Sequence, residues 1–151
     1  MSEVEKNEED APFGTETILV VEDLDAVRRV ACEMLALQGY QILEARNGVE
    51  ALEVYHTHAS RIDLIFTDII MPEMDGGELA EEVWKINPKM KILFGSGYPR
   101  NHQFEKIMSG RVVKFIAKPY NRLALSRKIR EVMDGGSRII EWLKETGAKK
   151  P

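Results

Sequence analysis

The sequence IDLIFTDIIMPEMDGGEL occupies residues 62–79 and begins with an apolar run that ends on an acid, Asp68. Such a run, bounded by turn residues, predicts a buried strand over residues 62–67. A Met-Pro pair and then an Asp-Gly-Gly follow, so the chain is expected to turn sharply after the acid. Asp68 either caps the helix that follows or contributes to a site at the end of the strand.

Strand-like and helix-like segments alternate on both sides of this stretch. Short apolar runs predict strands, and apolar residues at helical spacing predict a helix after each strand. Strict alternation favours an α/β fold with a parallel sheet covered by helices on both faces. The predicted strands are 17–21, 40–45, 62–67, 91–95 and 112–117, and the predicted helices are 25–39, 48–58, 76–87, 100–109 and 122–133.

The two ends of the chain differ from this pattern. Residues 1–16 are acidic with little to bury, which predicts a flexible leader or linker. Residues 17–134 form the predicted domain, and the Asp-Gly-Gly at 134–136 is expected to break the last helix. The C-terminal extension, 135–151, would then hold a separate short amphipathic helix over 137–147, whose role stays open between packing on its own domain and reaching a partner.

Composition narrows the class of protein. The net charge is −4, so the basic excess of a dominant nucleic-acid surface is absent. No apolar run approaches the roughly 20 residues of a membrane helix. The single cysteine, Cys32, cannot form an internal disulfide, which is consistent with a reducing compartment and a cytoplasmic protein.

Polar side chains follow four of the predicted strands, at the point where each strand ends. In open parallel α/β sheets, ligands bind outside these carboxyl ends. The sequence therefore predicts a site at this edge, built from Glu22 and Asp23, Asp68, Ser96 and Lys118.

These residue types indicate phosphoryl chemistry. Three carboxylates that converge repel one another, so a cation is needed to relieve them. Oxygen ligands without clustered Cys or His favour Mg²⁺ over zinc. A carboxylate beside Mg²⁺ can attack phosphorus to give an aspartyl-phosphate. A lysine, a hydroxyl and backbone N–H groups would then neutralise the phosphoryl oxygens.

Four segments of the chain resemble, in order and spacing, the receiver domain of two-component response regulators. They are ILVVEDLDAVRR, DLIFTDIIMPEMDGGEL, ILFGSGY and FIAKPY. The resemblance covers residues 17–133, and the Gly-Ser-Gly-Tyr-Pro run is most similar to receivers of hybrid histidine kinases. It implies a flavodoxin-like, doubly wound sheet of five strands in the order 2-1-3-4-5.

The resemblance also implies a role for each acid. Asp68 would be the phosphoacceptor and a metal ligand. Asp23 would bind Mg²⁺ directly, Glu22 would bind it through water, and the backbone carbonyl of Ile70 would be a further ligand. Glu22 replaces the more common Asp, and its longer side chain is expected to change the metal affinity.

The remaining motif residues would read out phosphorylation. Ser96 would be the switch hydroxyl and Lys118 the cation that pairs with the phosphoryl group. Phe115 occupies the family's aromatic switch position. The peptide before Pro119 is expected to be cis, as it usually is in the family.

The implied function is a phosphorylation-dependent signalling switch in a two-component phosphorelay. The phosphodonor would be a histidine kinase or a histidine phosphotransfer protein, and a target would bind the face of helix 100–109, strand 112–117 and helix 122–133. The chain would catalyse only its own phosphorylation and dephosphorylation, without nucleic acid or membrane partners. It could be a stand-alone regulator, a phosphorelay intermediate or part of a hybrid kinase.

Two other readings stay open. The same fold could serve as an interaction module without phosphorylation. Alternatively, Asp23 and Asp25 resemble the start of aspartyl-phosphate-forming phosphatases, in which Asp23 would be the nucleophile and Asp25 the acid. That reading gives no role to the block from Asp68 to Pro72 or to the interval from Ser96 to Lys118.

Overall fold

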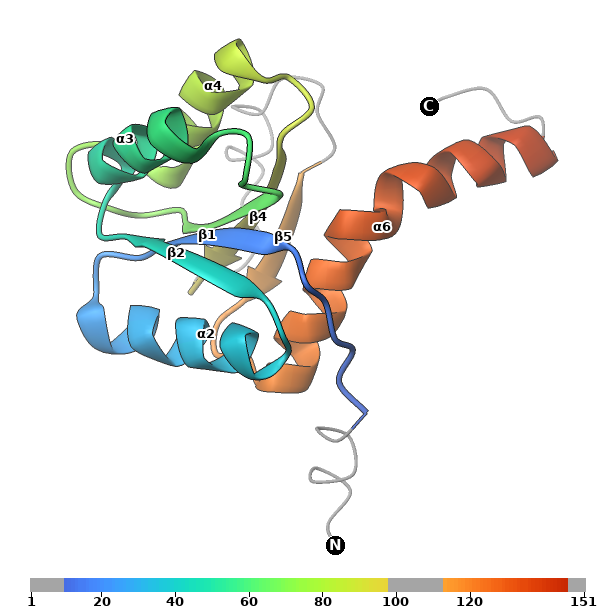
Figure 1. Cartoon of the computed structure of the whole chain (residues 1–151), viewed down its shortest axis with the longest axis horizontal. Helices are drawn as coiled ribbons and strands as arrows, with labels where there is room; N and C mark the ends of the chain where they lie inside the picture. The colour runs from blue at the N-terminus through green and yellow to red at the C-terminus, as the bar shows by residue number, and fades with distance from the viewer. Residues whose placement is uncertain (1–9, 98–112, 147–151) are drawn as a thin grey trace, which may run out of the picture.

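A computed structural model describes residues 10–97 and 113–146, with side chains described up to residue 135. The predicted helix 100–109 lies outside the described residues. Five parallel strands form one sheet in the order β2-β1-β3-β4-β5, which confirms the predicted strand order (Figure 1). The strands are β1 (Thr17–Val21), β2 (Gln41–Ala45), β3 (Leu64–Asp68), β4 (Lys91–Ser96) and β5 (Lys114–Ala117).

Helices cover both faces of this sheet, as predicted. Helices α3 and α4 lie on one face, and α2 and the first part of α6 lie on the other (Figure 1). Two hydrophobic cores result, one between each helix pair and the sheet. The helices are α2 (Asp25–Leu37), α3 (Gly48–His58), α4 (Gly76–Ile86) and α6 (Arg122–Thr146).

The two cores explain why the central strands read as continuous apolar runs. Successive side chains of a strand point to opposite faces, so both sets must be apolar when both faces are covered. Leu19 and Val21 of β1 enter the core under α3 and α4, whereas Ile18 and Val20 enter the core under α2 and α6. The edge strand β2 is only partly buried.

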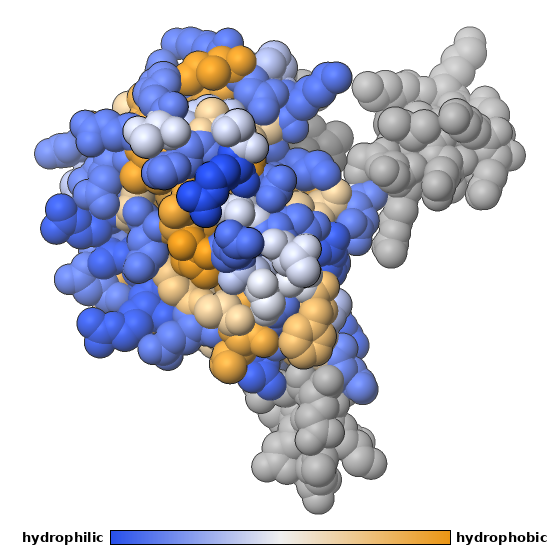
Figure 2. Space-filling view, viewed as in Figure 1, coloured by the Kyte–Doolittle hydropathy of each residue, from blue (hydrophilic) through white to orange (hydrophobic). Residues whose placement is uncertain are grey.

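The outer surface is mainly polar on the side of β2. Figure 2 shows hydrophilic side chains over most of this face, with apolar side chains gathered toward its middle. Among the described helices, none combines the length and the hydropathy that a membrane span requires.

Helices α3 and α4 begin at side chains that cap them. Asn47 accepts a hydrogen bond of 2.8 Å from the backbone N–H of Glu50, and Asp75 accepts one of 2.8 Å from that of Glu78. These bonds satisfy N–H groups that the first helical turn leaves without partners. The cap of α4 at Asp75 fixes the end of the loop that starts at Asp68.

The last helix differs from the sequence prediction. Helix α6 is continuous from Arg122 to Thr146, so the expected break at 134–136 and the separate helix over 137–147 are wrong. A glycine costs about 1 kcal/mol relative to alanine inside a helix, a penalty that weakens a helix without sterically ending it. Beyond the sheet, α6 extends away from the domain (Figure 1).

The segment just before β1 also differs from the flexible leader predicted over 1–16. The side-chain amide of Gln38 donates to the carbonyl oxygens of Ala11 and Pro12, at 3.1 and 3.0 Å. Glu16 forms an ion pair of 2.8 Å with Arg130 of α6. Residues 11–16 therefore pack on the folded domain, because their backbone finds hydrogen-bond partners that sequence composition does not reveal.

Candidate functional site

The strand register brings the predicted polar residues to one edge of the sheet. Asp68 is aligned with Gly95, and Ser96 with Ala117, so the carboxyl ends of β3, β4 and β5 lie level. Strand β1 lies on the other side of β3 and leads into Glu22 and Asp23. The chain reverses its strand order between β1 and β3, which is where doubly wound sheets bind ligands.

Three carboxylates meet at this edge. Glu22, Asp23 and Asp68 each offer one oxygen, and these oxygens lie within 4.8 Å of one another. Glu22 is buried, with 4% of its surface exposed, and the two aspartates are half-buried. The oxygen donors and their spacing fit a hard divalent cation, as the sequence predicts. The structure therefore assembles the acidic cluster from residues that are 46 positions apart in the chain, as the numbers of Glu22 and Asp68 show.

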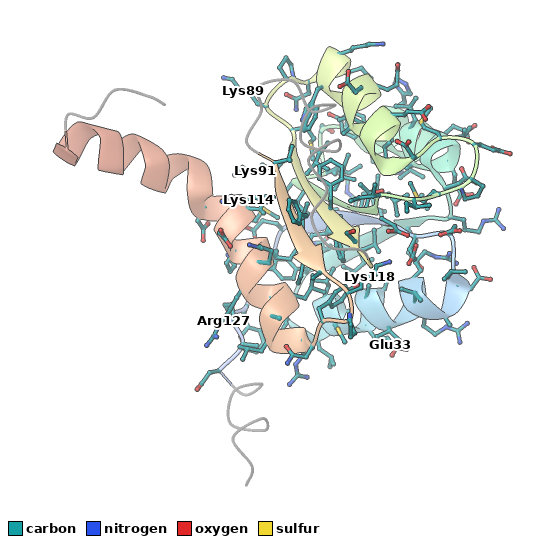
Figure 3. All side chains as sticks on the ribbon, turned by 180° about the vertical axis from the view of Figure 1, so that it is seen from behind. Glu33, Lys89, Lys91, Lys114, Lys118 and Arg127 are labelled. Carbon is teal, nitrogen blue, oxygen red and sulfur yellow. The ribbon has the colours of Figure 1, made fainter. Side chains whose placement is uncertain are left out.

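Lys118 lies between two of these acids. Its ammonium nitrogen is 2.8 Å from Oε1 of Glu22 and 3.5 Å from Oδ1 of Asp68. Figure 3 shows Lys118 where β5 ends, on the edge that carries the acids. The sequence predicts Lys118 as the cation beside Asp68, but it does not predict that Glu22 makes the shorter contact. The one available signal is the extra methylene of Glu22 relative to an aspartate.

The protonation of Glu22 is set by its burial. Desolvation raises the pKa of its carboxyl to about 7, against the opposing effect of the Lys118 hydrogen bond. The negative charge of Asp68 raises this pKa further. Near neutral pH the protonated and the charged form of the Glu22 carboxyl are therefore both populated, and a bound cation would compete with the proton.

This shift predicts how metal-free stability depends on pH. The folded state binds the Glu22 proton more tightly than the unfolded chain, so stability should fall as pH rises from about 4.5 to about 7. Glu22→Gln removes this titration, and the variant should gain stability relative to wild type over that range. Urea unfolding in EDTA at several pH values measures the difference. Parallel pH curves for the two proteins would contradict the assignment.

The loop after β3 holds Asp68 in place. The backbone N–H of Ile69 donates to Oδ1 of Asp68 at 2.9 Å, and the Thr67 hydroxyl donates to the Asp68 carbonyl oxygen at 2.9 Å. The N–H of Gly76 donates to the carbonyl oxygen of Ile69 at 2.8 Å, which closes the loop onto the start of α4. Glu73 in this loop has a φ of 67°, a left-handed conformation that is unusual for a residue other than glycine.

Gly76 is required by this close approach. A Cβ atom at residue 76 would lie 2.2 Å from the carbonyl oxygen of Asp68, which is backbone and cannot rotate away. Gly76→Ala is therefore expected to destabilise the fold by about 1–3 kcal/mol and to displace the loop that carries Asp68. Gly97→Ala is the matched control, because a Cβ there meets no atom of the described residues within 4 Å. Equal unfolding free energies for both variants in urea would contradict this steric account.

The other predicted residues lie at or near the same edge. Ser96 ends β4, and its carbonyl oxygen accepts a 2.7 Å hydrogen bond from the backbone N–H of Lys118. The peptide between Lys118 and Pro119 is cis, as predicted. Phe115 of β5 is partly buried against the core under α3 and α4. Ile70 follows Asp68 with its side chain 61% exposed. The metal-ligand role of the Ile70 carbonyl and the switch roles of Ser96 and Phe115 stay predictions.

Sequence comparison identifies the class of protein that this fold and site define. The family model of the response regulator receiver domain matches residues 18–130. The chain therefore belongs to the response regulator receiver domain family of two-component signalling.

Relatives in this family include parts of larger proteins and stand-alone ones. The chain is 36% identical over 121 residues to the sensor kinase CckA of Brucella abortus, a match that covers 80% of this chain and 13% of the kinase. It is 32% identical over 104 residues to the chemotaxis protein CheY of Bacillus subtilis, covering 68% of this chain and 85% of CheY.

Solved structures agree with the sequence relatives. The receiver domain of the hybrid histidine kinase CckA matches with a TM-score of 0.65 and 36% identity, over 78% of this chain and 98% of that chain. A response regulator receiver domain from Clostridium thermocellum matches with a TM-score of 0.74 over 82% of this chain and 98% of that chain, and its 23% identity supports the fold alone.

Proposed function

We propose that this domain accepts a phosphoryl group on Asp68 and acts as a phosphorylation-dependent switch in a two-component phosphorelay. The observation that carries the proposal is the meeting of Glu22, Asp23 and Asp68 within 4.8 Å, with the Lys118 ammonium 3.5 Å from Asp68. These three acids and the Ile70 carbonyl would hold Mg²⁺. When bound, Mg²⁺ would neutralise the carboxylates and the incoming phosphoryl oxygens.

Phosphoryl transfer needs little covalent chemistry from the protein. A carboxylate oxygen of Asp68 attacks phosphorus, and the bond from phosphorus to the donor nitrogen or oxygen breaks as the leaving group departs. The Lys118 ammonium, which lies 2.8 Å from Glu22 and carries three N–H donors, would also donate to a phosphoryl oxygen in this step. The backbone N–H of Ile69 holds Oδ1 of Asp68, which fixes the direction of attack.

The switch would follow from contacts that exist only with phosphate bound. A ligand shifts a conformational equilibrium only as far as it binds the two states differently. The Ser96 hydroxyl and the Lys118 ammonium would bind phosphoryl oxygens in one loop arrangement, and Phe115 would follow from its partly buried position in β5. Hydrolysis of the acyl phosphate would reset the domain, so the chain would catalyse only its own phosphorylation and dephosphorylation.

An apolar groove beside the site suits a phosphodonor. It has a volume of about 480 Å³, and Lys118 forms part of its wall. A helix that carries a phosphohistidine could lay its apolar face there and present the phosphoryl group to Asp68. The donor would be a histidine kinase or a histidine phosphotransfer protein in the cytoplasm. The other lining residues are Ala26, Val27, Val30 and Met34 of α2, with Pro119 and Tyr120.

A charge placed in this groove should slow phosphoryl transfer from a protein donor but not from the small donor acetyl phosphate. Val30 is 49% exposed, so Val30→Glu should fold normally. Transfer from a phosphorylated histidine kinase that labels the wild type is expected to slow at least about tenfold, because the charge would be desolvated at the interface. Labelling by acetyl phosphate should not change. The control is Val49→Glu on α3, where the valine is 42% exposed. Equal kinase transfer in both variants would remove the groove from the proposal.

The proposed function is tested most simply by mass spectrometry of the intact protein. Incubation with acetyl phosphate and Mg²⁺ is expected to add about 80 Da, the mass of one phosphoryl group, and EDTA should prevent the gain. The mass should return to its starting value after the donor is removed. A protein that gains no mass with Mg²⁺ would instead support the interaction module that works without phosphorylation.

The relation to larger proteins leads to a second, finer proposal. The 36% identity to the CckA receiver domain favours a receiver of the hybrid histidine kinase type, and the resemblance of the Gly-Ser-Gly segment of this chain to such receivers agrees with it. Comparable matches to CheY proteins keep a stand-alone regulator as the alternative. Reconstituted transfer from a kinase core encoded next to this chain would favour the hybrid type.

A further inference from the structure

The loop that carries Glu22 and Asp23 leads into helix α2, and this helix has no side-chain N-cap. Helix α2 has Leu24 at its N-cap, and no side chain there bonds the first turn. The loop backbone is held by the Glu22 N–H, which donates to the Ala45 carbonyl oxygen at 3.1 Å. The Asp23 N–H donates to Oε2 of Glu22 at 3.0 Å, a bond within the cluster itself. The carbonyl side of Glu22 therefore needs a partner from elsewhere.

Arg28 supplies that partner from the second turn of α2. Its Nη1 donates to the backbone carbonyl oxygen of Glu22 at 2.8 Å. Its Nη2 donates to Oδ1 of Asp25 at 2.7 Å, and its Nε donates to Oε1 of Glu44 at 3.2 Å. All three guanidinium nitrogens are thus engaged, and each contact comes from a different part of the domain: the loop, α2 and the end of β2.

Arg28 and its two carboxylate partners differ in how far they are exposed to solvent. The Arg28 side chain is only 13% exposed, whereas Asp25 is 73% exposed and Glu44 is 55% exposed. Ion pairs to exposed carboxylates contribute little stability by themselves. Their effect is to orient the planar guanidinium, so that its remaining N–H group points at Glu22. A lysine could reach one of these acceptors but could not hold all three at once.

We propose that Arg28 is a positioning residue for the metal site. Arg28 holds the loop of Glu22 and Asp23 in the conformation that binds the cation. This inference rests on the proposed function, because it assumes that the acid cluster binds Mg²⁺. Arg28 touches the backbone of Glu22 and leaves its carboxylate free for Lys118 and the cation.

The charge of Arg28 and its positioning role predict opposite effects on Mg²⁺ affinity when the residue is replaced. A positive charge near the cluster opposes cation binding, so its removal alone would tighten Mg²⁺ binding. Loss of positioning would weaken it, because the two acids would have to be ordered when the ion binds. Outer-shell hydrogen bonds at metal sites typically affect affinity by 10- to 100-fold. Arg28→Lys separates the effects, since it keeps the charge and loses the three-way fork.

The test is a calorimetric titration of the full chain with Mg²⁺ in four forms: wild type, Arg28→Lys, Arg28→Ala and Arg29→Ala. Both Arg28 variants are expected to bind Mg²⁺ about tenfold more weakly than wild type. Arg29 is the next residue on the same helix and is exposed, so Arg29→Ala should match wild type within about twofold, allowing for screening of its charge. Amide shifts of residues 22–24 in metal-free protein should change only in the Arg28 variants.

Each outcome of this test decides the inference. Wild-type affinity in Arg28→Lys, or tighter binding in Arg28→Ala, would overturn the positioning role while leaving the metal site intact. A wild-type protein that binds no Mg²⁺ would overturn the site itself, and the inference with it. Urea unfolding of each variant in EDTA checks the fold. If Arg28→Ala proves unfolded, the comparison between Arg28→Lys and Arg29→Ala carries the decision.

Discussion

Asp68→Asn is expected to abolish the phosphoryl mass gain completely while the protein stays folded. The amide cannot act as a nucleophile toward phosphorus as the carboxylate does. Its shape is nearly the same, so the hydrogen bond from the Ile69 N–H to Oδ1 can persist. Removal of one of three converging charges should also relieve repulsion with Glu22 and Asp23, so metal-free stability should be equal to or higher than that of wild type.

Asp75→Asn is the matched control for this change. Asp75 lies in the segment that follows Asp68 and caps α4 by accepting from the Glu78 N–H, a role that asparagine performs about equally well. The control removes the same charge from a nearby residue and should leave phosphorylation intact. Phosphoryl incorporation by the Asp68→Asn protein at the wild-type rate would reject Asp68 as the acceptor.

Lys118→Met is expected to slow phosphorylation by acetyl phosphate roughly 100-fold, because one preorganised charge-neutralising group is lost. The same change removes the only described cation within salt-bridge distance of both Glu22 and Asp68. Removing one partner of a buried ion pair costs about 3 kcal/mol, so metal-free protein should lose stability above pH 7. The loss should shrink at lower pH, where Glu22 takes up a proton.

Lys114→Met provides the comparison for this prediction. Lys114 is the first residue of β5, the strand that leads into Lys118, and it pairs with Glu131 at 3.3 Å; both side chains are exposed by more than a third. Exposed pairs contribute about 0–1 kcal/mol, so this variant should keep both its stability and its labelling rate. Equal effects of the two substitutions on the rate would show that Lys118 has no special role in the transfer.

The sequence predicts the sheet well because one physical cause dominates its pattern. Strands β1, β3 and β4 are covered on both faces, so their side chains are apolar almost without interruption, and turn residues mark where each strand ends. The polar residues that follow them must therefore meet at one edge. Asp68 and Lys118, 50 positions apart by their numbers, could be placed at one site for this reason.

The errors at the two ends of the domain have a different origin. The composition of residues 11–16 gives no sign of the Gln38 amide that binds their carbonyl oxygens. The glycines after Asp134 suggest a helix end, yet their cost is small beside the cooperative extension of a helix that is already formed. Both features depend on contacts or cooperativity that a local pattern does not encode.

Contacts within the site were only partly predictable. The convergence of Glu22, Asp23 and Asp68 follows from topology. Which of the two acids, Glu22 or Asp68, lies closer to the Lys118 ammonium depends on the length and conformation of the side chains. The need for glycine at residue 76 likewise follows from the approach of the Asp68 carbonyl and not from a turn with positive φ. The role proposed for Arg28 rests on three hydrogen bonds that the sequence does not reveal.

The central claim is that the phosphoryl group resides on Asp68. The most direct test is to label the full chain with acetyl phosphate and Mg²⁺, reduce the acyl phosphate with borohydride, and locate the reduced residue by peptide mass spectrometry. The account predicts reduction of residue 68 alone, and none in EDTA. Reduction at Asp23, as expected for a phosphatase-type nucleophile, or a stable phosphoryl group on any other residue would contradict it.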